Sequence, residues 1–364
     1  MVSLESFDNG NVNDVVEQNK FNNGDKMENN NCNICRSEVM FLYDVQDGNP
    51  NGDPLNGNKP RMDENSKINI VSDVRLKRTI RDYLSDYQGY DIFIRETEYV
   101  NGDDVFIKDA KRRAIDYSST GGKYKSLSDG CKDLRKNILD ECIDVRLFGA
   151  TIPLELDTGK KKKEKSGIDL TGPVQFKNAR SLNKVNPISI KGTGAFASGD
   201  NKTTSTFREE YNLPYSLINF YGIINENAAV DTNLSNRDID VLMDAIWNGT
   251  KNLITRSKIG QIPRVLLQIE YCEDYYHIGD LNNMISLDIT DSDCKVSEDI
   301  RNITEFTLDC NLLINVLLEN KDKIKCVHYK VDNMVTFKDF GHFSYVIKHL
   351  EDNGVLCSEF DCIH

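Results

Sequence analysis

The spacing of apolar residues divides most of the chain into strands and helices. The run at 39–45 is apolar and rich in β-branched and aromatic residues, which is typical of a central strand. A loop rich in Gly, Asn and Pro follows, and then Ser72 or Asp73 can cap a basic helix. One face of this helix is apolar at helical spacing and is expected to be buried: Leu76, Ile80, Tyr83 and Leu84.

The next segment predicts a hairpin followed by a helix. Two β-rich runs, 92–100 and 105–108, are separated by Asn101-Gly102, a dipeptide that favours a tight turn. A helical stretch lies near 134–143, and the surrounding residues from 111 to 168 are mixed.

Three further strands and a second long helix are predicted downstream. The strands are expected at the apolar runs 170–176, 215–224 and 265–271. Ser235 and Asp238 form a capping-box pattern before the helix. Its buried face is expected to carry apolar residues at helical spacing: Ile239, Leu242, Ala245, Ile246, Leu253 and Ile254.

The predicted order, without its insertions, is β, α, β, β, α, β. This is the α+β arrangement of ferredoxin-like and RNA-recognition folds. The polar, basic excursion at 180–214 is too long for an ordinary loop in a compact domain, and this length predicts a functional arm. Residues 1–38 contain ten Asn and few large apolar side chains, which predicts a disordered extension.

Charge is distributed unevenly along the chain. A net charge of −13 and a pI near 5.0 argue against a protein that coats nucleic acid through its overall charge. Three islands are nevertheless basic: 59–81 has seven Lys and Arg against three acids, 177–208 six against one, and 251–264 four against none. Folding could assemble these islands into one basic groove, although chance clustering on solvated faces is the alternative that charge alone leaves open.

The cysteines and the hydropathy pattern favour a cytoplasmic protein. The ten Cys have no regular disulfide spacing, and residues 1–38 lack the apolar core of a signal peptide. The longest aliphatic cluster, 312–318, is too short to span a bilayer, so no membrane partner is expected.

The loop at 47–52 matches the opening of a calcium-binding loop, D-x-N-x-N-G. Its twelfth position is Asn58, where a bidentate Glu is required, so a calcium-binding structural protein is a minor alternative. The same loop could instead lie against a phosphate backbone with its free N–H groups, or form a surface turn.

Two other segments have the composition of nucleic-acid contacts. The segment 191–197 contains G-x-G-x-x-A, but no clear strand precedes it, and its composition suits an extended hairpin better than a dinucleotide site. The connection 255–261 offers hydroxyl, guanidinium, ammonium and amide groups that suit phosphate and sugar contacts. A plain basic helix end is the alternative for this connection.

Signals for metal binding and catalysis are weak. Cys32 and Cys35 form half of a zinc site, and only distant residues could complete it: Cys357, Cys362 and His364. With five His and no evident pair of nucleophile and base, the chain offers little general acid–base capacity. We therefore expect no cofactor, no metal and no enzymatic activity.

Several ordered motifs resemble the repeated backbone subunit of type I CRISPR effector (Cascade) complexes, most closely subtype I-B. They are GNPNGDP at 48–54, KPRMD at 59–63 and SDVRLKRTIRDYL at 72–84. TGPVQF at 171–176, followed by Arg180-Ser181-Leu182, has a similar place in the order. The resemblance covers roughly residues 38–280.

The resemblance implies a ferredoxin-like palm with finger and thumb insertions. The expected boundaries are palm at 39–85, 170–180 and 215–275, fingers at 86–169 and thumb at 181–214, followed by an acidic C-terminal lobe at 276–364. The thumb is expected to fold over guide RNA and to touch a neighbouring copy.

The resemblance further implies a protein that binds guide RNA (crRNA) and assembles with copies of itself and other Cascade subunits. Base pairing between guide and target DNA would then carry recognition. The alternative is a metal-dependent RNA-cleaving subunit that uses a loop aspartate, Asp47, Asp53 or Asp63. The residues expected to contact RNA are Asn49, Asn51, Lys59, Arg61, Arg75, Lys77, Arg78, Arg81, Arg180, Ser181, Lys191, Arg256, Ser257, Lys258 and Gln261.

Overall fold

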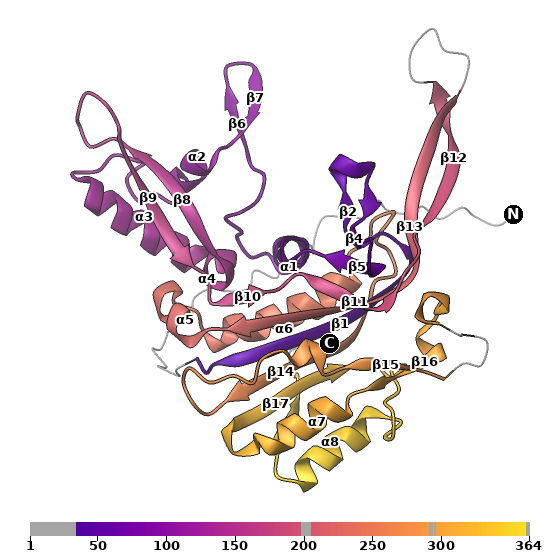
Figure 1. The fold of residues 1–364 in the computed structure, drawn as a ribbon. Helices are drawn as coiled ribbons and strands as arrows, with labels where there is room; N and C mark the ends of the chain where they lie inside the picture. Colours follow the sequence, from indigo (N-terminus) through magenta and orange to yellow (C-terminus); the bar gives the residue numbers. More distant parts are fainter. Residues whose placement is uncertain (1–33, 198–204, 291–293, 295, 362–364) are drawn as a thin grey trace, which may run out of the picture. The chain divides into compact units, whose positions relative to one another are not determined.

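A mixed sheet of ten strands forms the centre of the structure (Figure 1), a computed structural model that describes residues 34–197, 205–290, 294 and 296–361. Only the pair β17–β18 is parallel among the described strands of this sheet. The main spatial order is β18 (Cys357–Glu359), β17 (Ile324–Val331), β14 (Ile262–Tyr271), β1 (Ser37–Gly48), β13 (Ser205–Ile224), β11 (Ala179–Lys184), β5 (Ile68–Val71) and β4 (Met62–Asp63). Two more strands, β10 (Val174–Phe176) and β12 (Ile188–Ala197), also pair with β13.

Strand β1 is central because both of its faces are apolar. It pairs with β13 on one side and β14 on the other, and Phe41 lies opposite Phe220 and Leu266. All residues from Ser37 to Val45 are buried. The predicted central strand is therefore confirmed, although it begins two residues earlier, inside the segment expected to be a disordered extension. Residues 1–33 of that extension lie outside the described residues.

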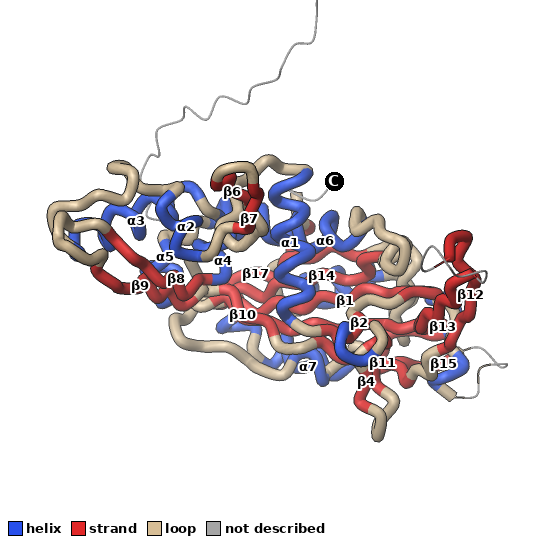
Figure 2. The backbone as a smooth tube through the Cα atoms, turned by 90° about the horizontal axis from the view of Figure 1, so that it is seen from above, coloured by secondary structure: helices blue, strands red, loops and turns tan. Residues whose placement is uncertain are grey.

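Two helices cover one face of this sheet (Figure 2): α1 (Asp73–Asp86) and α6 (Asn236–Lys251). Ser72 caps α1, and Ser235 with Asp238 forms the expected capping box of α6. A Cβ atom at Gly249 would lie 3.0 Å from the Cβ of Tyr83, so glycine permits the two helices to pack closely.

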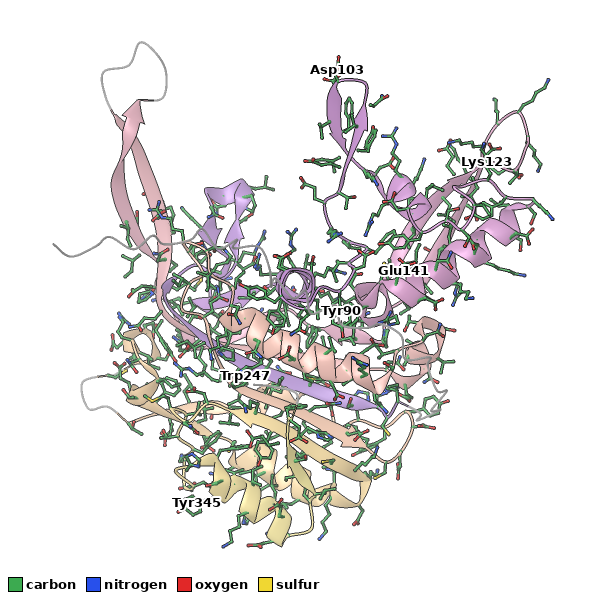
Figure 3. The ribbon with its side chains drawn as sticks, turned by 180° about the vertical axis from the view of Figure 1, so that it is seen from behind. Tyr90, Asp103, Lys123, Glu141, Trp247 and Tyr345 are labelled. Carbon is green, nitrogen blue, oxygen red and sulfur yellow. The ribbon has the colours of Figure 1, made fainter. Side chains whose placement is uncertain are left out.

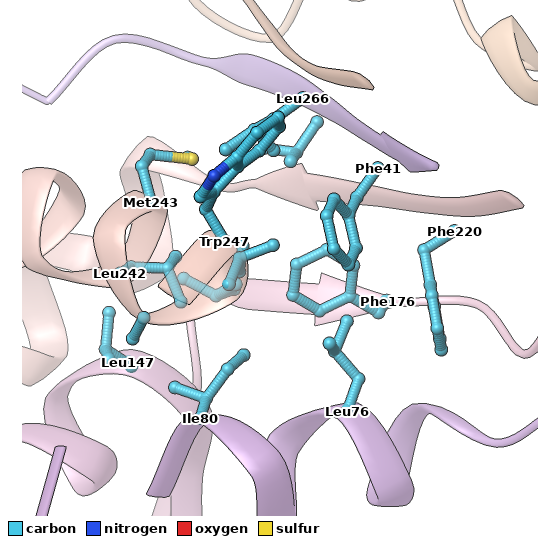
Figure 4. Close-up of a cluster of buried hydrophobic side chains, with 14 of the residues drawn as sticks. Phe41, Leu76, Ile80, Leu147, Phe176, Phe220, Leu242, Met243, Trp247 and Leu266 are labelled. Carbon is cyan, nitrogen blue, oxygen red and sulfur yellow. The ribbon is translucent and has the colours of Figure 1, made fainter. Parts of the chain in front are cut away.

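The core beneath these helices contains the predicted apolar faces (Figure 4). Leu76 and Ile80 of α1 and Leu242 of α6 are buried in one cluster with Phe41 and Phe220. The predicted helix 235–254 is too long at its end, because Asn252 caps the helix and leaves Ile254 exposed.

The opposite face is covered by the C-terminal lobe. Its elements are β15 (Ser286–Ile289), β16 (Phe306–Asp309), α7 (Asn311–Glu319) and α8 (Phe343–Asp352), with short 3-10 turns at Leu281–Asn283, Ser297–Asp299, Ile303–Glu305 and Lys321–Lys323. Leu313 and Val346 from these helices share a core with Leu267 and Val327 of the sheet. The region expected to form an acidic C-terminal lobe also adds β17 and β18 to the central sheet.

The insertion between α1 and β10 has its own apolar core, which includes Leu134, Ile138 and Ile152. The expected hairpin turns at Asn101-Gly102, and Asp103 lies at its tip (Figure 3). The elements are β6 (Glu98–Asn101), β7 (Asp104–Ile107), α2 (Ala110–Ile115), α3 (Leu127–Glu141), α4 (Ile143–Phe148), β8 (Gly149–Leu156) and β9 (Glu164–Thr171).

The prediction of a single strand at 170–176 is wrong. β9 ends at Thr171 and pairs with β8, whereas β10 begins at Val174 and pairs with β13. A Cβ atom at Gly172 would lie 2.0 Å from the carbonyl carbon of Phe148, so the chain turns between two sheets at a position that admits only glycine.

The polar excursion contains an extended hairpin, as its composition predicted. β12 pairs with the first part of β13 from Ile188 opposite Asn212 onward, and β13 then continues into the central sheet. Residues 198–204, between the two strands, lie outside the described residues. After β13, the short helix α5 (Glu226–Thr232) leads to α6.

Candidate nucleic-acid interface

Three segments far apart in sequence meet where β1 ends. The backbone N–H of Asn49 donates to the Ser257 carbonyl at 2.7 Å, which joins the loop after β1 to the connection after α6. The Asn51 side chain donates to Ser72 Oγ at 3.2 Å, which joins the same loop to the cap of α1. We call the resulting site the basic corner; it comprises Asn49, Arg75, Ser257, Lys258 and Gln261.

Two cations of the basic corner are partly desolvated. Burial lowers the pKa of Arg75, and burial together with the neighbouring Arg75 lowers the pKa of Lys258. Arg75 donates to Thr79 Oγ1 at 3.2 Å, and Lys258 donates to Ser257 Oγ at 3.3 Å. Among residues 34–361 that the structure describes, no carboxylate lies within ion-pair distance of either cation. The corner therefore has positive charge that an anion would stabilise.

Polar atoms of the same corner lack partners. The buried atoms Asn49 Oδ1, Arg75 Nε and Gln261 Nε2 have no hydrogen bond to any described residue. A buried polar atom without a partner costs about 1–3 kcal/mol, so a water molecule or a ligand that reached these atoms would be stabilised.

A short protrusion lies beside this corner. It consists of β2 (Gly52–Asp53), a 3-10 turn (Pro54–Asn56) and β3 (Lys59–Pro60). The ammonium group of Lys59 lies 4.7 Å from the centre of the Tyr211 ring on β13, and the exposed Arg61 pairs with Asp53 at 3.4 Å. Lys59 and the adjoining Arg61 therefore both lie at the surface.

Lys77 and Arg81 are one turn apart on a face of α1 distinct from its apolar residues, so the sequence predicts that both can reach solvent or phosphate. The structure differs from this expectation. Their side chains are only 14% and 11% exposed. Lys77 pairs with Asp73 at 3.1 Å, and Arg81 pairs at 2.9 Å with the fully buried Asp144. Both cations also lie over the Phe148 ring. The expectation is wrong because α4 packs against this face of α1, a contact that local sequence cannot show.

The remaining residue of α1 that was expected to contact RNA is exposed. Arg78 projects to the surface and pairs with Asp82 at 2.6 Å, one turn further along the helix. An exposed pair of this kind is weak and can exchange its carboxylate for a phosphate.

The residues after β10 that were expected to contact RNA are partly exposed and partly buried. Arg180 is exposed and pairs with Asp63 at 3.2 Å, and Lys191 is exposed on β12. Ser181 is buried, accepts from the Asn69 N–H and donates to the Asn183 carbonyl, so its hydroxyl is used within the fold. Arg256 is exposed and pairs with Glu210 of β13 at 3.1 Å.

Sequence reasoning missed one feature of this interface. It did not identify the acidic partners Asp144, Glu210 and Asp63, which are remote in sequence from the cations they contact.

The described residues contain neither a cluster of metal-binding side chains nor a helix that could span a membrane. No group of three or more His, Cys, Asp or Glu side chains there is placed to hold a metal ion. Cys32, Cys362 and His364 of the half zinc motif lie outside the described residues. None of the described helices combines the length and the apolar character needed to cross a bilayer.

The solved structures that are similar to this chain include the following two. One belongs to a "CRISPR RNA-guided surveillance complex, pre-nicking", with a TM-score of 0.49, 11% identity, and coverage of 89% of this chain and 96% of that one. The other belongs to a "CRISPR RNA-guided surveillance complex", with a TM-score of 0.45, 11% identity, and coverage of 87% and 99%.

Comparison of sequences gives a family. The model of the family described as CRISPR-associated protein Cas7 matches residues 35–311. A CRISPR-associated protein Cas7 of Haloferax volcanii is 34% identical over 308 residues, which cover 81% of this chain and 86% of that protein. Both matches span most of the chain and confirm the resemblance seen in its motifs. The chain belongs to the CRISPR-associated Cas7 family.

Proposed function

We propose that this chain is the guide-RNA-binding backbone subunit of a type I CRISPR complex, of subtype I-B. In this assembly, copies of the chain stack along one crRNA in the cytoplasm and, with other Cascade subunits, present the guide to target DNA. The observation that carries the RNA contact is the pair Arg75 and Lys258, two partly desolvated cations without a carboxylate partner in the described residues. A backbone phosphate supplies the missing anion.

The proposed path of the RNA starts at the basic corner, which holds phosphate. Exposed cations extend the path along α1, β11, the protrusion with the residue after it, the arm and the connection after α6: Arg78, Arg180, Lys59, Arg61, Lys191 and Arg256. Phosphate contacts leave base edges free, as a guide requires. Within this path Lys77, Arg81 and Ser181 act by fixing the fold, because their polar groups already have protein partners.

We infer that the palm is ferredoxin-like. Its four strands in chain order are β1, β10 with β11, β13 and β14, and the two helices α1 and α6 lie between them in the required places. The spatial order β14-β1-β13-β11 with all pairs antiparallel supports this assignment. The insertion from β6 to β9 then corresponds to the fingers, and the hairpin β12–β13 to the thumb.

We infer binding rather than cleavage as the activity. Two of the three loop aspartates have structural partners: Asp53 caps the 3-10 turn and pairs with Arg61, and Asp63 accepts from Ser66 and Arg180. Metal-dependent RNA cleavage is the competing function. Incubation of the protein–guide complex with complementary labelled RNA, with and without Mg²⁺, should leave the RNA intact, whereas regularly spaced cuts would establish the nuclease.

Salt-dependent binding tests the phosphate site. The double substitution Arg75→Gln and Lys258→Gln should weaken binding of unrelated RNA sequences equally and should reduce the slope of log K against log salt by about 0.7 for each lost contact. Lys348→Gln, at an exposed position on α8, is the matched control and should leave the slope unchanged. An unchanged slope in a folded double variant would remove the basic corner from the RNA path.

A further inference from the structure

The basic corner contains a buried hydrogen-bond acceptor as well as its cations. Asn49 is only 2% exposed, and its side-chain amide donates through Nδ2 to the Asn58 carbonyl at 2.7 Å. This bond fixes the orientation of the amide, because a reversed amide would place Oδ1 against the carbonyl oxygen of Asn58. The acceptor Oδ1 has no hydrogen bond to any described residue.

Asn49 is held against the connection after α6, which carries part of the positive charge of the corner. The Asn49 N–H donates to the Ser257 carbonyl at 2.7 Å. A Cβ atom at Gly48 would lie 3.1 Å from the same carbonyl oxygen, so glycine permits this close approach. Lys258 follows directly in the chain, and Arg75 contributes, after burial, to its lowered pKa. The acceptor therefore belongs to a corner whose charged groups are all donors.

A phosphate cannot satisfy this acceptor. The phosphodiester and ring oxygens of a nucleic-acid backbone accept hydrogen bonds but donate none, whereas the 2′-hydroxyl of RNA both donates and accepts. It is the only donor in the RNA backbone, and the DNA backbone has none. The corner also contains a buried donor, Nε2 of Gln261, a residue that is 4% exposed and has no described partner at this atom. One acceptor and one donor match the two roles of a 2′-hydroxyl.

We propose that Asn49 recognises the 2′-hydroxyl of a nucleotide whose phosphate the basic corner holds: the hydroxyl donates to Asn49 Oδ1 and accepts from Gln261 Nε2. The proposal rests on the proposed RNA-binding function and adds the residues that select RNA over DNA. The cations cannot supply this selectivity, because both nucleic acids carry the same phosphates. Since no base is contacted, the preference for RNA is the same for every guide sequence.

Replacement of the 2′-hydroxyl by fluorine tests the proposal on the native protein. The full-length chain is titrated with a single-stranded RNA and with the 2′-fluoro RNA of the same sequence. Fluorine keeps the sugar conformation of RNA but donates no hydrogen bond. Loss of this bond should weaken binding about fivefold, and equally so for unrelated sequences. Equal affinity for the two strands overturns the proposal, and failure of the native chain to bind RNA at all rejects the proposed function itself.

Variants at position 49 assign the hydroxyl to this residue. Asn49→Leu should bind RNA and 2′-fluoro RNA alike, both as weakly as the native chain binds 2′-fluoro RNA. Asn49→Asp keeps an acceptor, so it should still prefer RNA although its charge lowers both affinities. A preference for RNA in Asn49→Leu, or its loss in Asn49→Asp, overturns the proposal. Asn353→Leu is the matched control, because this remote amide also donates to a carbonyl, that of His349 at 2.8 Å, and it should keep both native affinities.

Discussion

Glu38 is a fully buried carboxylate held by hydrogen-bond donors. It accepts from the phenols of Tyr221 and Tyr271 and from the N–H groups of Ile278 and Gly279, the last two at 2.9 Å each. This network ties the start of β1 to the segment after β14. Burial raises the pKa of both phenols, so they remain donors across the physiological range.

The substitution Glu38→Gln should therefore destabilise the fold. The amide nitrogen would face a donor, and at least one buried polar group would lose its partner. The free energy of unfolding in urea should fall by about 1–3 kcal/mol. Tyr221→Phe, which removes one donor and leaves the carboxylate with its other partners, is the matched comparison and should cost less. A Glu38→Gln variant as stable as the native chain would show that the carboxylate is not required.

The contacts of the Glu270 carboxylate predict that the protein loses stability in acid. Its carboxylate lies 3.5 Å from His328 and 2.9 Å from Lys325, and the His328 hydrogen bond above all holds the pKa of Glu270 at about 2 in the folded state. Because the pKa of Glu270 is lower in the folded than in the unfolded state, its ionised carboxylate stabilises the protein at pH values above the unfolded pKa. This contribution should disappear as the pH falls from about 4.5 to about 2. Glu270→Gln should flatten the dependence of unfolding free energy on pH in that window, while an unchanged curve would contradict the assignment.

At the scale of elements, the first described residues pack into the body of the protein. Ile34 is buried in the core beneath α1 and α6, and Arg36 pairs with Glu226 of α5 through Nη2 and Oε1 at 3.1 Å. A chain that begins at Glu38 loses this pair and leaves Glu226 with fewer partners. Its unfolding free energy should be about 3–5 kcal/mol below that of a chain beginning at Ile34, as for other broken buried pairs. Equal thermal stability of the two truncations would show that the pair contributes nothing.

Elements with local causes were predictable from sequence. Ser72 caps α1, Ser235 with Asp238 begins α6, and the apolar run after Ser37 forms β1, because each depends on residues that are neighbours in the chain. The errors arose from tertiary contacts. Arg81 is removed from solvent by Asp144, 63 positions away, and the chain near Gly172 turns because Phe148 lies against it. The motif residues of the candidate site were found, but their division into exposed and buried groups required the fold.

At the scale of the whole molecule, the C-terminal residues complete the central sheet. The family match ends at residue 311, whereas β17 and β18 follow it. β17 pairs with β14 from Val265 opposite Val331 to Tyr271 opposite Ile324. Without β17, β14 would be an exposed and apolar edge strand, a known hazard for aggregation. The C-terminal lobe therefore protects the edge remote from the arm.

The arm at the other end predicts how copies assemble. β12 and the first part of β13 pair only with each other among the described strands, so their removal leaves the central sheet intact. Replacement of residues 189–207 by a short Gly/Ser linker should give a folded monomer, with native thermal stability, that binds RNA but no longer forms multi-copy complexes on it. Analytical ultracentrifugation with and without guide RNA measures both properties. We propose phosphate binding at the basic corner and neighbour contact at the arm, so undiminished assembly of this variant would refute the assignment of the arm as a thumb.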